Sequence, residues 1–535
     1  MSVIPEDLDD NALLVLAKRS LEQNNPDKSE AIYRKLIEKF PNVVELRVNL
    51  GATHRRQNRL EAAIDVLGEA LRLSPSHPGA LFNLANALRE NGDSAQAEIR
   101  YLECIDIASG FVDAYLNLSD LYGDLDRYDE AKYLLTKATE FAPDDTRIWN
   151  NLGNTCKELG EFERAETHLS LAIELAPDVS DYYRNLAGVH FSAGNDRAAL
   201  ETINQTLKRA PEDPEAHCLR AFIDLSMGEF QSGWREYAWR WKSKEHQAPR
   251  PFPFPVWDGT DLVGKSILIW GEQGIGDEIM YASILPDLLE TGARVLLECD
   301  PRLVALLSRS FPEVEVFARQ SSVSKVVTSS GCDFQMPIGD LAAHFRNKRS
   351  DFIVQAPFLT AASARKINLR NGYRVLAHQR VLVGIAWKSG AGRTGKARSL
   401  AIEELLPILR LENACFINLQ YGDIDDDLQA IKDRCGIHIH VDPTIDQMTD
   451  IDGFAAQIAA LDLIITAANT TVHVAGGLGV QTEVLVPGVA DWRWLRKSCK
   501  SIWYPSVRLH RRDTSTDPSA YLNELVEIVN SKYKI

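Results

Sequence analysis

In the first half of this 535-residue chain one pattern of residues recurs at a constant interval, equal to the separation in sequence between Asn49 and Asn83. Five asparagines mark the interval, and four of the five precede Leu and then Gly or Ala: Asn49, Asn83, Asn117, Asn151 and Asn185. Prolines keep the same register: Pro41, Pro75, Pro143, Pro177 and Pro211. A fixed period of this length is typical of solenoids, in which each helical hairpin buries its apolar face against its neighbours. We therefore expect an all-α solenoid over residues 1–247, with six regular units in 10–213 and a degenerate seventh in 214–247.

The unit that begins at residue 146 carries the fullest set of marks, which are Trp149, Leu152, Gly153, Ala165, Leu169, Ala172 and Pro177. In residue type and spacing this unit resembles the tetratricopeptide repeat. An ordinary helical bundle is the alternative, but it gives no reason for one period to persist along the chain. The resemblance implies a concave groove, lined by the first helix of each hairpin, that suits a polypeptide or a partner protein.

The recurring asparagines have two possible roles. In tetratricopeptide arrays the residue before the Leu-Gly/Ala pair faces the groove, and in the O-GlcNAc transferases an asparagine ladder at this place binds peptide backbone. The resemblance therefore implies that Asn49, Asn83, Asn117, Asn151 and Asn185 bind an acceptor peptide, because an amide both donates and accepts hydrogen bonds. The alternative is that each asparagine satisfies a loop or backbone group of the neighbouring hairpin.

A proline-rich segment, residues 248–265, separates the solenoid from the rest of the chain. Its prolines alternate with other residues at Pro249, Pro251, Pro253 and Pro255, which excludes a helix and predicts an extended strap. Aromatic residues gather in and before it: Trp234, Trp239, Trp241, Phe252, Phe254 and Trp257. We expect them to pack the strap against both halves of the chain, and the alternative is that they only cap the solenoid.

From residue 266 the chain alternates short apolar runs, typical of buried strands, with helical segments. The alternation restarts at residue 381. We expect two Rossmann-like α/β lobes, at 266–356 and 381–535, joined by a crossover at 357–380. In such sheets ligands bind beyond the carboxyl ends of the strands, so the loops after strands are the candidate sites.

The first of these loops, GEQGIGDE at 271–278, combines flexible glycines with acidic residues at a helix start. Gly274 and Gly276 allow a tight turn near a ligand. The loop and its setting resemble the heptosyltransferase-like family, whose fold is the two-lobed GT-B fold. In that family the Asp of a Gly-Asp pair at this place is the general base, which implies the same role for Asp277. The alternative role of Asp277 is a helix N-cap.

Two later loops are candidates for holding a phosphate. The loop at 388–399 supplies four cations on an acidic protein: Lys388, Arg393, Lys396 and Arg398. The loop at 469–479 opens a helix, whose N-terminus favours anions, and its polar residues are Asn469, Thr470, Thr471 and His473. A solvated basic loop and a core histidine are the alternatives. By position alone, Gln420 and Tyr421 at the end of another strand are candidates for contacting a nucleobase.

Several site classes are disfavoured by the sequence. The eight cysteines contain no CxxC pair, and the acidic run at 425–427 opens a helix, so we expect no metal site. The net charge of −16 argues against a nucleic-acid partner. No segment resembles a membrane helix or a secretory signal, so a cytoplasmic location is the expectation.

Taken together, the repeats, strap and two lobes resemble bacterial tetratricopeptide-repeat glycosyltransferases, similar in plan to O-GlcNAc transferase and flagellin glycosyltransferases. The resemblance implies a metal-independent, inverting transfer of sugar from a nucleotide sugar to a polypeptide hydroxyl, with flagellin one possible acceptor and no cofactor beyond that donor. Two alternatives stay open. One is transfer to a lipid or polysaccharide, and the other is a catalytically silent nucleotide-sugar-binding scaffold.

Overall fold

The computed structural model describes residues 9–244, 246, 248–352, 357–390, 392–512 and 520–533; the side chains of Val326, Arg393, Thr394 and Ala520 lie outside the description. The chain divides into two compact units, which we call unit 1 (Met1–Pro211) and unit 2 (Glu212–Ile535). Among the described residues, no helix combines the length and the hydrophobicity that crossing a bilayer requires.

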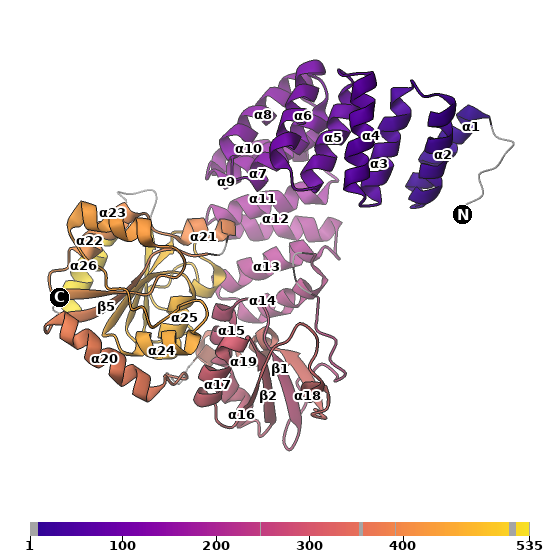
Figure 1. Ribbon diagram of the computed structural model, residues 1–535. Helices are drawn as coiled ribbons and strands as arrows, with labels where there is room; N and C mark the ends of the chain where they lie inside the picture. The colour runs from indigo at the N-terminus through magenta and orange to yellow at the C-terminus, as the bar shows by residue number, and fades with distance from the viewer. Residues whose placement is uncertain are drawn as a thin grey trace. The chain divides into compact units, whose positions relative to one another are not determined.

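The described part of unit 1 is a stack of antiparallel helical hairpins (Figure 1). Its helices are α1 (Asp10–Glu22), α2 (Pro26–Lys39), α3 (Val44–Arg56), α4 (Leu60–Leu73), α5 (Pro78–Glu90), α6 (Ser94–Ile107), α7 (Val112–Asp124), α8 (Tyr128–Phe141), α9 (Thr146–Glu158), α10 (Phe162–Leu175), α11 (Ser180–Ser192) and α12 (Asp196–Arg209). The first helix of each hairpin starts one full repeat interval after the previous one, as does the second. The predicted all-α solenoid and its period are therefore confirmed.

Small residues hold the two helices of a hairpin close together. A Cβ added to Gly51 on α3 would lie 2.5 Å from Cγ of Leu67 on α4, and one added to Gly153 would lie at the same distance from Cγ of Leu169. The second helices contribute alanines that are at most 1% exposed: Ala63, Ala97, Ala131, Ala165 and Ala199. This spacing explains why small residues recur with the period of the repeat.

Unit 2 contains two separate parallel sheets, as expected for a pair of α/β lobes. The first sheet has the strand order β3-β2-β1-β4, and the second has the order β6-β5-β7-β8-β9. The strands are β1 (Ser266–Trp270), β2 (Arg294–Cys299), β3 (Glu315–Ala318), β4 (Phe334–Pro337), β5 (Val381–Ala386), β6 (Ala414–Asn418), β7 (Leu463–Ala467), β8 (Thr482–Pro487) and β9 (Val507–Arg512). Because the central strands are buried on both faces, they read as continuous apolar runs in the sequence.

Helices connect these strands and cover the sheets (Figure 1). Those of the first lobe are α15 (Ile275–Ala282), α16 (Leu285–Glu290), α17 (Val304–Ser310), α18 (Lys325–Thr328) and α19 (Ala342–Phe345), with the 3-10 turns η2 (Pro301–Leu303), η3 (Ile338–Leu341) and η4 (Arg349–Phe352). Those of the crossover and second lobe are α20 (Ser363–Ala377), α21 (Gly392–Arg398), α22 (Ile402–Leu409), α23 (Asp425–Cys435), α24 (Ile451–Ala459), α25 (Thr470–Gly477) and α26 (Ala520–Tyr533), with η5 (Trp492–Trp494).

The degenerate seventh hairpin forms α13 (Pro214–Met227) and α14 (Phe230–Tyr237), followed by η1 (Ala238–Lys242), and it belongs to unit 2. Its aromatic residues enter the main hydrophobic core of that unit, where Phe230 packs on Phe352. The strap also packs on the first lobe, because Trp257 donates its backbone N–H to Gln335 of β4 and Phe252 lies in a cluster with Trp270.

Candidate functional site

A cavity of about 470 Å³ lies between the two lobes of unit 2. Loops that follow β1, β2, β5, β6, β7 and β8 line it, so it sits beyond the carboxyl ends of strands from both sheets. Its lining residues are Gly274, Ile275, Gly276, Asp277, Arg302, Ser389, Gly390, Arg398, Tyr421, Gln447, Met448, Ile451, Phe454, Ala468, Asn469, Thr470, His473, Asp491, Arg493 and Trp494. The volume suits a small organic ligand, and the position is the usual one in open α/β sheets.

Two helices, one from each lobe, present their N-terminal ends to this cavity. Helix α15 follows Gly274 and carries Asp277 in its first turn, and helix α25 follows Asn469 and begins at Thr470. The exposed N–H groups at a helix start carry partial positive charge. Two such ends at one cavity favour an anionic ligand.

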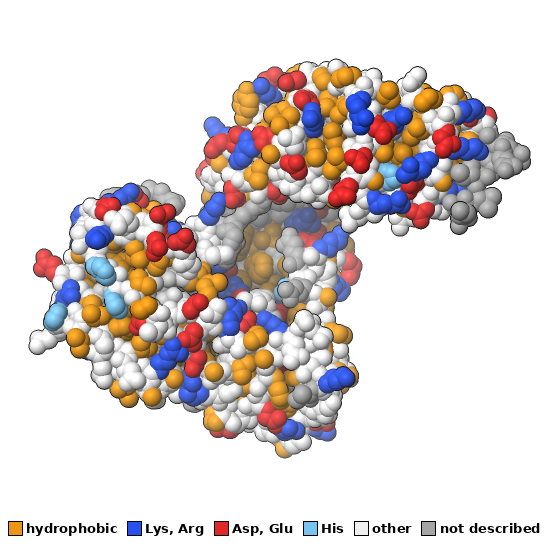
Figure 2. All heavy atoms as spheres, viewed as in Figure 1, with side chains coloured by type: hydrophobic (Ala, Val, Ile, Leu, Met, Phe, Trp, Pro, Cys, Tyr) orange, Lys and Arg blue, Asp and Glu red, His pale blue; other side chains and the backbone are white. Residues whose placement is uncertain are grey.

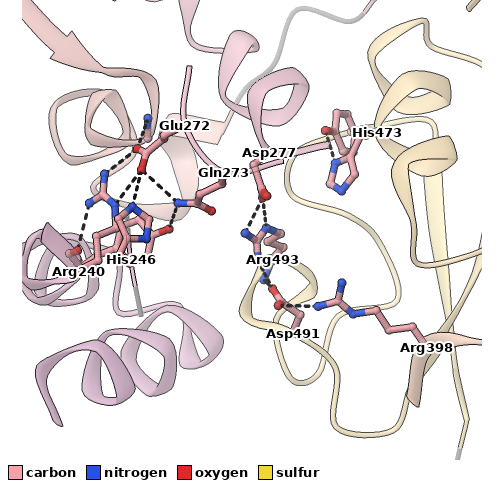
Figure 3. Close-up of polar contacts among 12 residues, drawn as sticks. Arg240, His246, Glu272, Gln273, Asp277, Arg398, His473, Asp491 and Arg493 are labelled. Carbon is pink, nitrogen blue, oxygen red and sulfur yellow. Dashed lines mark hydrogen bonds and ion pairs between the residues drawn. The ribbon is translucent and has the colours of Figure 1, made fainter. Parts of the chain in front are cut away.

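An ion-pair chain crosses the cavity between the lobes (Figure 3). Arg493 donates two hydrogen bonds to Oδ1 of Asp277, at 2.9 Å from Nε and 2.5 Å from Nη2. Its Nη1 donates to Asp491 at 2.7 Å, and Asp491 is in turn 3.3 Å from Nη2 of Arg398. Residues predicted separately, Asp277 and Arg398, thus meet through two residues between them.

The charges in this chain stabilise one another. Burial alone would lower the pKa of Arg493, but Asp277 and Asp491 hold it well above its usual value. Burial alone would likewise raise the pKa of Asp491, and Arg493 with Arg398 holds it below its usual value. Both groups are therefore ionised at neutral pH. The two bonds from Arg493 reach a single oxygen of Asp277, and its Oδ2 is outside this pair.

Asp277 does not act as the N-cap of α15, which was its alternative role. The N-cap position belongs to Gly274, and no side chain makes a capping hydrogen bond there. The backbone N–H of Asp277 instead bonds to the carbonyl of Gly274 at 3.0 Å. The carboxylate is thus turned toward the cavity, where Arg493 meets it.

His473 lies in the first turn of α25 and borders the cavity while keeping only 8% exposure. Its Nδ1 is 2.8 Å from the hydroxyl of Tyr504. Burial lowers the pKa of His473 to about 4, so the imidazole is neutral at pH 7. A Cβ added to Gly276 would lie 2.9 Å from Cδ2 of His473, which explains the need for glycine where α15 meets α25.

Of the other residues predicted at the start of this helix, some line the cavity and some hold the surrounding loops in place. Asn469 caps α25, because its Oδ1 accepts the N–H of Thr471 at 3.0 Å, and its Nδ2 donates to the carbonyl of Lys388 at 3.0 Å. Thr470 lines the cavity, whereas the side chain of Thr471 is fully buried. Asn469 therefore joins the loops that follow β5 and β7.

The basic loop after β5 is likewise only partly at the cavity. Arg398 lines it. Lys388 turns toward α23, where its Nζ lies 2.5 Å from Oδ2 of Asp427. Lys396 is exposed on α21, and the side chain of Arg393 lies outside the described residues.

Of the two residues predicted after β6, only Tyr421 borders the cavity. Gln420 is 2% exposed, and its Oε1 accepts the backbone N–H groups of Trp387 and Lys388 at 2.9 and 2.7 Å. Its amide therefore holds the loop after β5. Tyr421 borders the cavity, and its hydroxyl accepts the N–H of Gly390 at 2.6 Å.

The acidic run at 425–427 has a structural explanation in Asp427, which accepts a hydrogen bond from Nε1 of Trp387 and pairs with Lys388. Within the part of the chain that the structure describes, no group of three His, Cys, Asp or Glu side chains is arranged to hold a metal ion.

Sequence reasoning missed five charged or polar contributors to the cavity: Arg302, Ser389, Gln447, Asp491 and Arg493. Arg493 stands between two tryptophans, a pattern typical of a packed segment. The available signal was its position, because the segment Asp491–Trp494 follows the end of β8, where a loop of the second sheet reaches the ligand edge.

In unit 1 the recurring asparagines bond largely within the array. Asn117 donates to Oδ1 of Asn86 at 2.7 Å, Asn151 to Oδ1 of Asp120 at 3.3 Å and Asn185 to Oδ1 of Asn150 at 2.7 Å. Asn83 donates to the carbonyl of Gly79 in its own helix, and the backbone carbonyl of Asn49 accepts the hydroxyl of Thr53. All five side chains are half-buried. Three of them thus link neighbouring repeats.

Unit 1 also has a cavity of its own, of about 590 Å³, lined mainly by the first helices of successive hairpins. It is lined by Arg55, Phe82, Asn86, Arg89, Glu90, Ser94, Asn117, Leu121 and Asp124. Figure 2 shows acidic and basic side chains interspersed with hydrophobic ones on the visible face of the repeats. Ion pairs such as that between Arg147 and Asp113, at 2.8 Å, connect adjacent hairpins of unit 1.

The repeats match known family models. Residues 14–78, 54–110, 124–186 and 157–221 match models of the tetratricopeptide repeat. These repeats are tetratricopeptide repeats. A solved tetratricopeptide repeat protein from Parabacteroides merdae is 20% identical, with a TM-score of 0.37, and the match covers 43% of this chain and 91% of that one.

Among curated proteins, Protein FlbA of Caulobacter vibrioides is 32% identical over 333 residues. The match covers 59% of this chain, which is more than unit 1 (Met1–Pro211) can supply, so it extends into unit 2. The chain spans about half of FlbA, 55% of its length, and smaller shares of the other relatives.

Two shorter matches are to transferases. The human protein O-mannosyl-transferase TMTC1 is 27% identical over 130 residues, covering 24% of this chain and 14% of that protein. A UDP-N-acetylglucosamine–peptide N-acetylglucosaminyltransferase of Giardia intestinalis is 29% identical over 96 residues, covering 18% of this chain and 6% of that enzyme.

Proposed function

We propose that the two lobes of unit 2 form a GT-B glycosyltransferase domain, which moves a sugar from a nucleotide-activated donor to a hydroxyl group. The observation that carries the proposal is the cavity at the carboxyl ends of both parallel sheets. Two helix N-termini and the side chains of Arg302, Arg398 and Arg493 meet there. These are groups that would bind a diphosphate and stabilise the charge it gains as the sugar departs.

Asp277 is the general base in this proposal. The acceptor oxygen attacks the anomeric carbon and forms the new C–O bond, and its proton passes to the Asp277 carboxylate. The bond from the anomeric carbon to the diphosphate breaks, and its electron pair leaves with the phosphate oxygen. Attack opposite the leaving group inverts the anomeric centre. No step in this scheme requires a metal ion, because the arginines and the start of α25 receive the charge.

The pairing with Arg493 would keep Asp277 from acting as a base until the donor has bound. While Arg493 donates to Oδ1 of Asp277, that oxygen is engaged and not free to accept the proton of an acceptor hydroxyl. A diphosphate in the cavity would compete with Asp277 for the donors of Arg493. Donor binding then releases Oδ1 of Asp277 before the acceptor arrives.

The remaining contacts follow from the places of the side chains. We assign the phosphates to Arg398, Thr470 and His473, with Asn469 and Thr471 shaping the start of α25. We assign the nucleobase to Tyr421 and the apolar wall formed by Met448, Ile451 and Phe454. A neutral His473 donates or accepts a hydrogen bond without adding charge.

We propose a polypeptide acceptor, bound by the tetratricopeptide repeats. The names of the human and Giardia relatives describe transfer to protein or peptide, and tetratricopeptide arrays commonly bind partner polypeptides. Flagellin is a candidate acceptor on the resemblance to flagellin glycosyltransferases. Because three asparagines already donate to the neighbouring repeat, the peptide would use their second N–H and their oxygen.

The test begins with calorimetric titration of UDP, GDP, ADP and CMP and continues with sugar transfer from the matching donor to polypeptides. Asp277→Asn should keep nucleotide affinity within a few-fold and slow transfer by about 10²- to 10⁴-fold. Asp426→Asn is the matched control, because Asp426 is exposed in the first turn of α23 and should leave both unchanged. No binding of any nucleotide would refute the proposal. Binding without transfer by the unaltered chain would favour the silent scaffold, and transfer to lipid or polysaccharide alone would reassign the acceptor.

A further inference from the structure

A buried arginine just after the α13–α14 hairpin of unit 2 reaches the loop that follows β1. Arg240, on η1, is 3% exposed. It donates to Glu272 at 2.7 Å from Nη2 and 3.2 Å from Nε, and its Nη2 lies 2.5 Å from Oδ1 of Asp340, which follows β4 (Figure 3). A helical segment that precedes the strap thus supplies the cation for two carboxylates of the first lobe.

Glu272 depends on this cation. Burial opposes its ionisation, yet His246 and Arg240 lower the pKa of Glu272 to about 2. Its Oε1 also accepts the N–H of Gly339 at 3.2 Å. Removing one partner from such a buried pair leaves an uncompensated charge, so the loop would have to rearrange to hydrate Glu272.

The next residue of the loop is held in an unfavourable backbone conformation. Gln273 has a φ of 63°, in the left-handed region that side chains other than glycine rarely adopt. Its Nε2 donates to the hydroxyl of Tyr237, on α14, at 2.6 Å. Gly274 and the start of α15 follow directly, so the hairpin and η1 together contact the two residues that set the direction of the loop toward Asp277.

The same hairpin contacts the opposite lobe beside Arg493. Trp234 of α14 packs edge-on against Trp492, with ring centroids 5.4 Å apart and planes at 86°. The ring centroid of Tyr237 lies 6.2 Å from that of Trp492. The carbonyl of Ser226, on α13, accepts the N–H of Arg496 at 3.1 Å. Both sides of the Asp277–Arg493 pair are therefore anchored to one helical hairpin.

We propose that the α13–α14 hairpin and the turn η1 that follows it position the two loops that form the Asp277–Arg493 pair, with Arg240 and Gln273 as positioning residues. The catalytic meaning of this inference rests on the proposed glycosyltransferase function. The placement of the loops does not, because it follows from contacts with the hairpin alone. The competing explanation is that these contacts only add stability to unit 2.

Two variants separate positioning from stability. Arg240→Lys keeps a cation but removes the two-pronged contact with Glu272. Gln273→Gly removes the bond to Tyr237 and also relieves the positive φ, so stability should not fall. The matched control is Arg346→Lys, because Arg346 is 1% exposed, donates to Asp287 at 2.8 Å and contacts neither loop through its side chain.

The measurement is hydrogen exchange of residues 271–277 in the full chain, with thermal unfolding of each variant and steady-state transfer alongside. We expect both variants to speed exchange in this segment about tenfold while the control does not. We expect kcat to fall about 10- to 100-fold with the donor KM changed much less, because the donor contacts stay in place.

Unchanged exchange in Gln273→Gly would overturn the inference, and this variant decides alone if Arg240→Lys does not fold. A rise in exchange spread evenly over unit 2, or an equal rise in Arg346→Lys, would assign the contacts to stability and also overturn it. If the unaltered chain transfers no sugar, the proposed function fails while the exchange rates still decide whether the hairpin positions the loops.

Discussion

The neutral imidazole of His473 makes a prediction about stability and pH. Its pKa is lowered by burial to about 4, whereas an imidazole in an unfolded chain has a pKa near 6.5. Below pH 6.5 the unfolded chain therefore binds a proton that the folded chain does not. The stability that this group contributes is present above pH 6.5 and is lost as pH falls toward 4.

The magnitude follows from the two pKa values. Lowering the pH from 7.5 to 5 should cost the folded state about 2 kcal/mol through His473 alone. In His473→Asn this loss should disappear, because Asn does not titrate, and the amide can still meet the hydroxyl of Tyr504. Other groups titrate in the same range, so the quantity to compare is the difference in pH dependence between the two proteins.

Urea unfolding at the two pH values measures this difference. Tryptophan fluorescence reports mainly on unit 2, which contains nine of the ten tryptophans. His438→Asn is the control, because this histidine lies outside the cavity, in the segment before α24. Equal pH dependence in the unaltered chain and His473→Asn would refute a neutral, buried imidazole at this position.

Glu278 should give folding stability the opposite pH dependence, because burial raises its pKa to about 7 and its contribution is lost as pH rises from about 4.5 to 7. In urea unfolding, Glu278→Gln should abolish about 2 kcal/mol of that loss between pH 5 and 7.5. An unchanged pH dependence in this variant would contradict the prediction. In unit 1, Gly51→Ala should cost about 1–3 kcal/mol against Leu67, offset in part by helix propensity. The added Cβ of Gly68→Ala meets no atom within 4 Å, so this variant should stabilise the fold by up to about 1 kcal/mol. Equal melting temperatures of Gly51→Ala and Gly68→Ala in circular dichroism would contradict this prediction. Arg398→Ala should weaken calorimetric binding of a nucleoside diphosphate about tenfold and spare the nucleoside, and an equal loss for both would exclude a phosphate contact.

The solenoid was predictable because its information is local. Each hairpin repeats one pattern of small and apolar residues, and the helices begin at the interval that the recurring asparagines predict. The strands of unit 2 were visible for a similar reason, since runs buried on both faces are apolar throughout. The positions of loops relative to strand ends then located much of the cavity, including Asp277, Arg398 and Thr470.

Pairing between distant side chains was not predictable in this way. Asp277 and Arg493 are 216 residues apart, and the sequence around one of them does not predict that it pairs with the other. Gln420 is a polar residue at the end of a strand, as expected of a ligand contact. Its side-chain oxygen instead accepts hydrogen bonds from two backbone N–H groups. The repeat pattern of α13 and α14 also could not reveal that they pack with unit 2, because that depends on the surface they meet.

The membership of α13 and α14 in unit 2 limits how this chain could have been assembled by recombination. A junction after residue 247 would separate Glu272 and Asp340 from Arg240, leaving two carboxylates in the first lobe without their cation. It would also uncover the rings that Phe230 and Trp234 contact. A junction near Glu212 avoids both defects, so the last hairpin is expected to be inherited with the α/β lobes while the number of repeats before it varies.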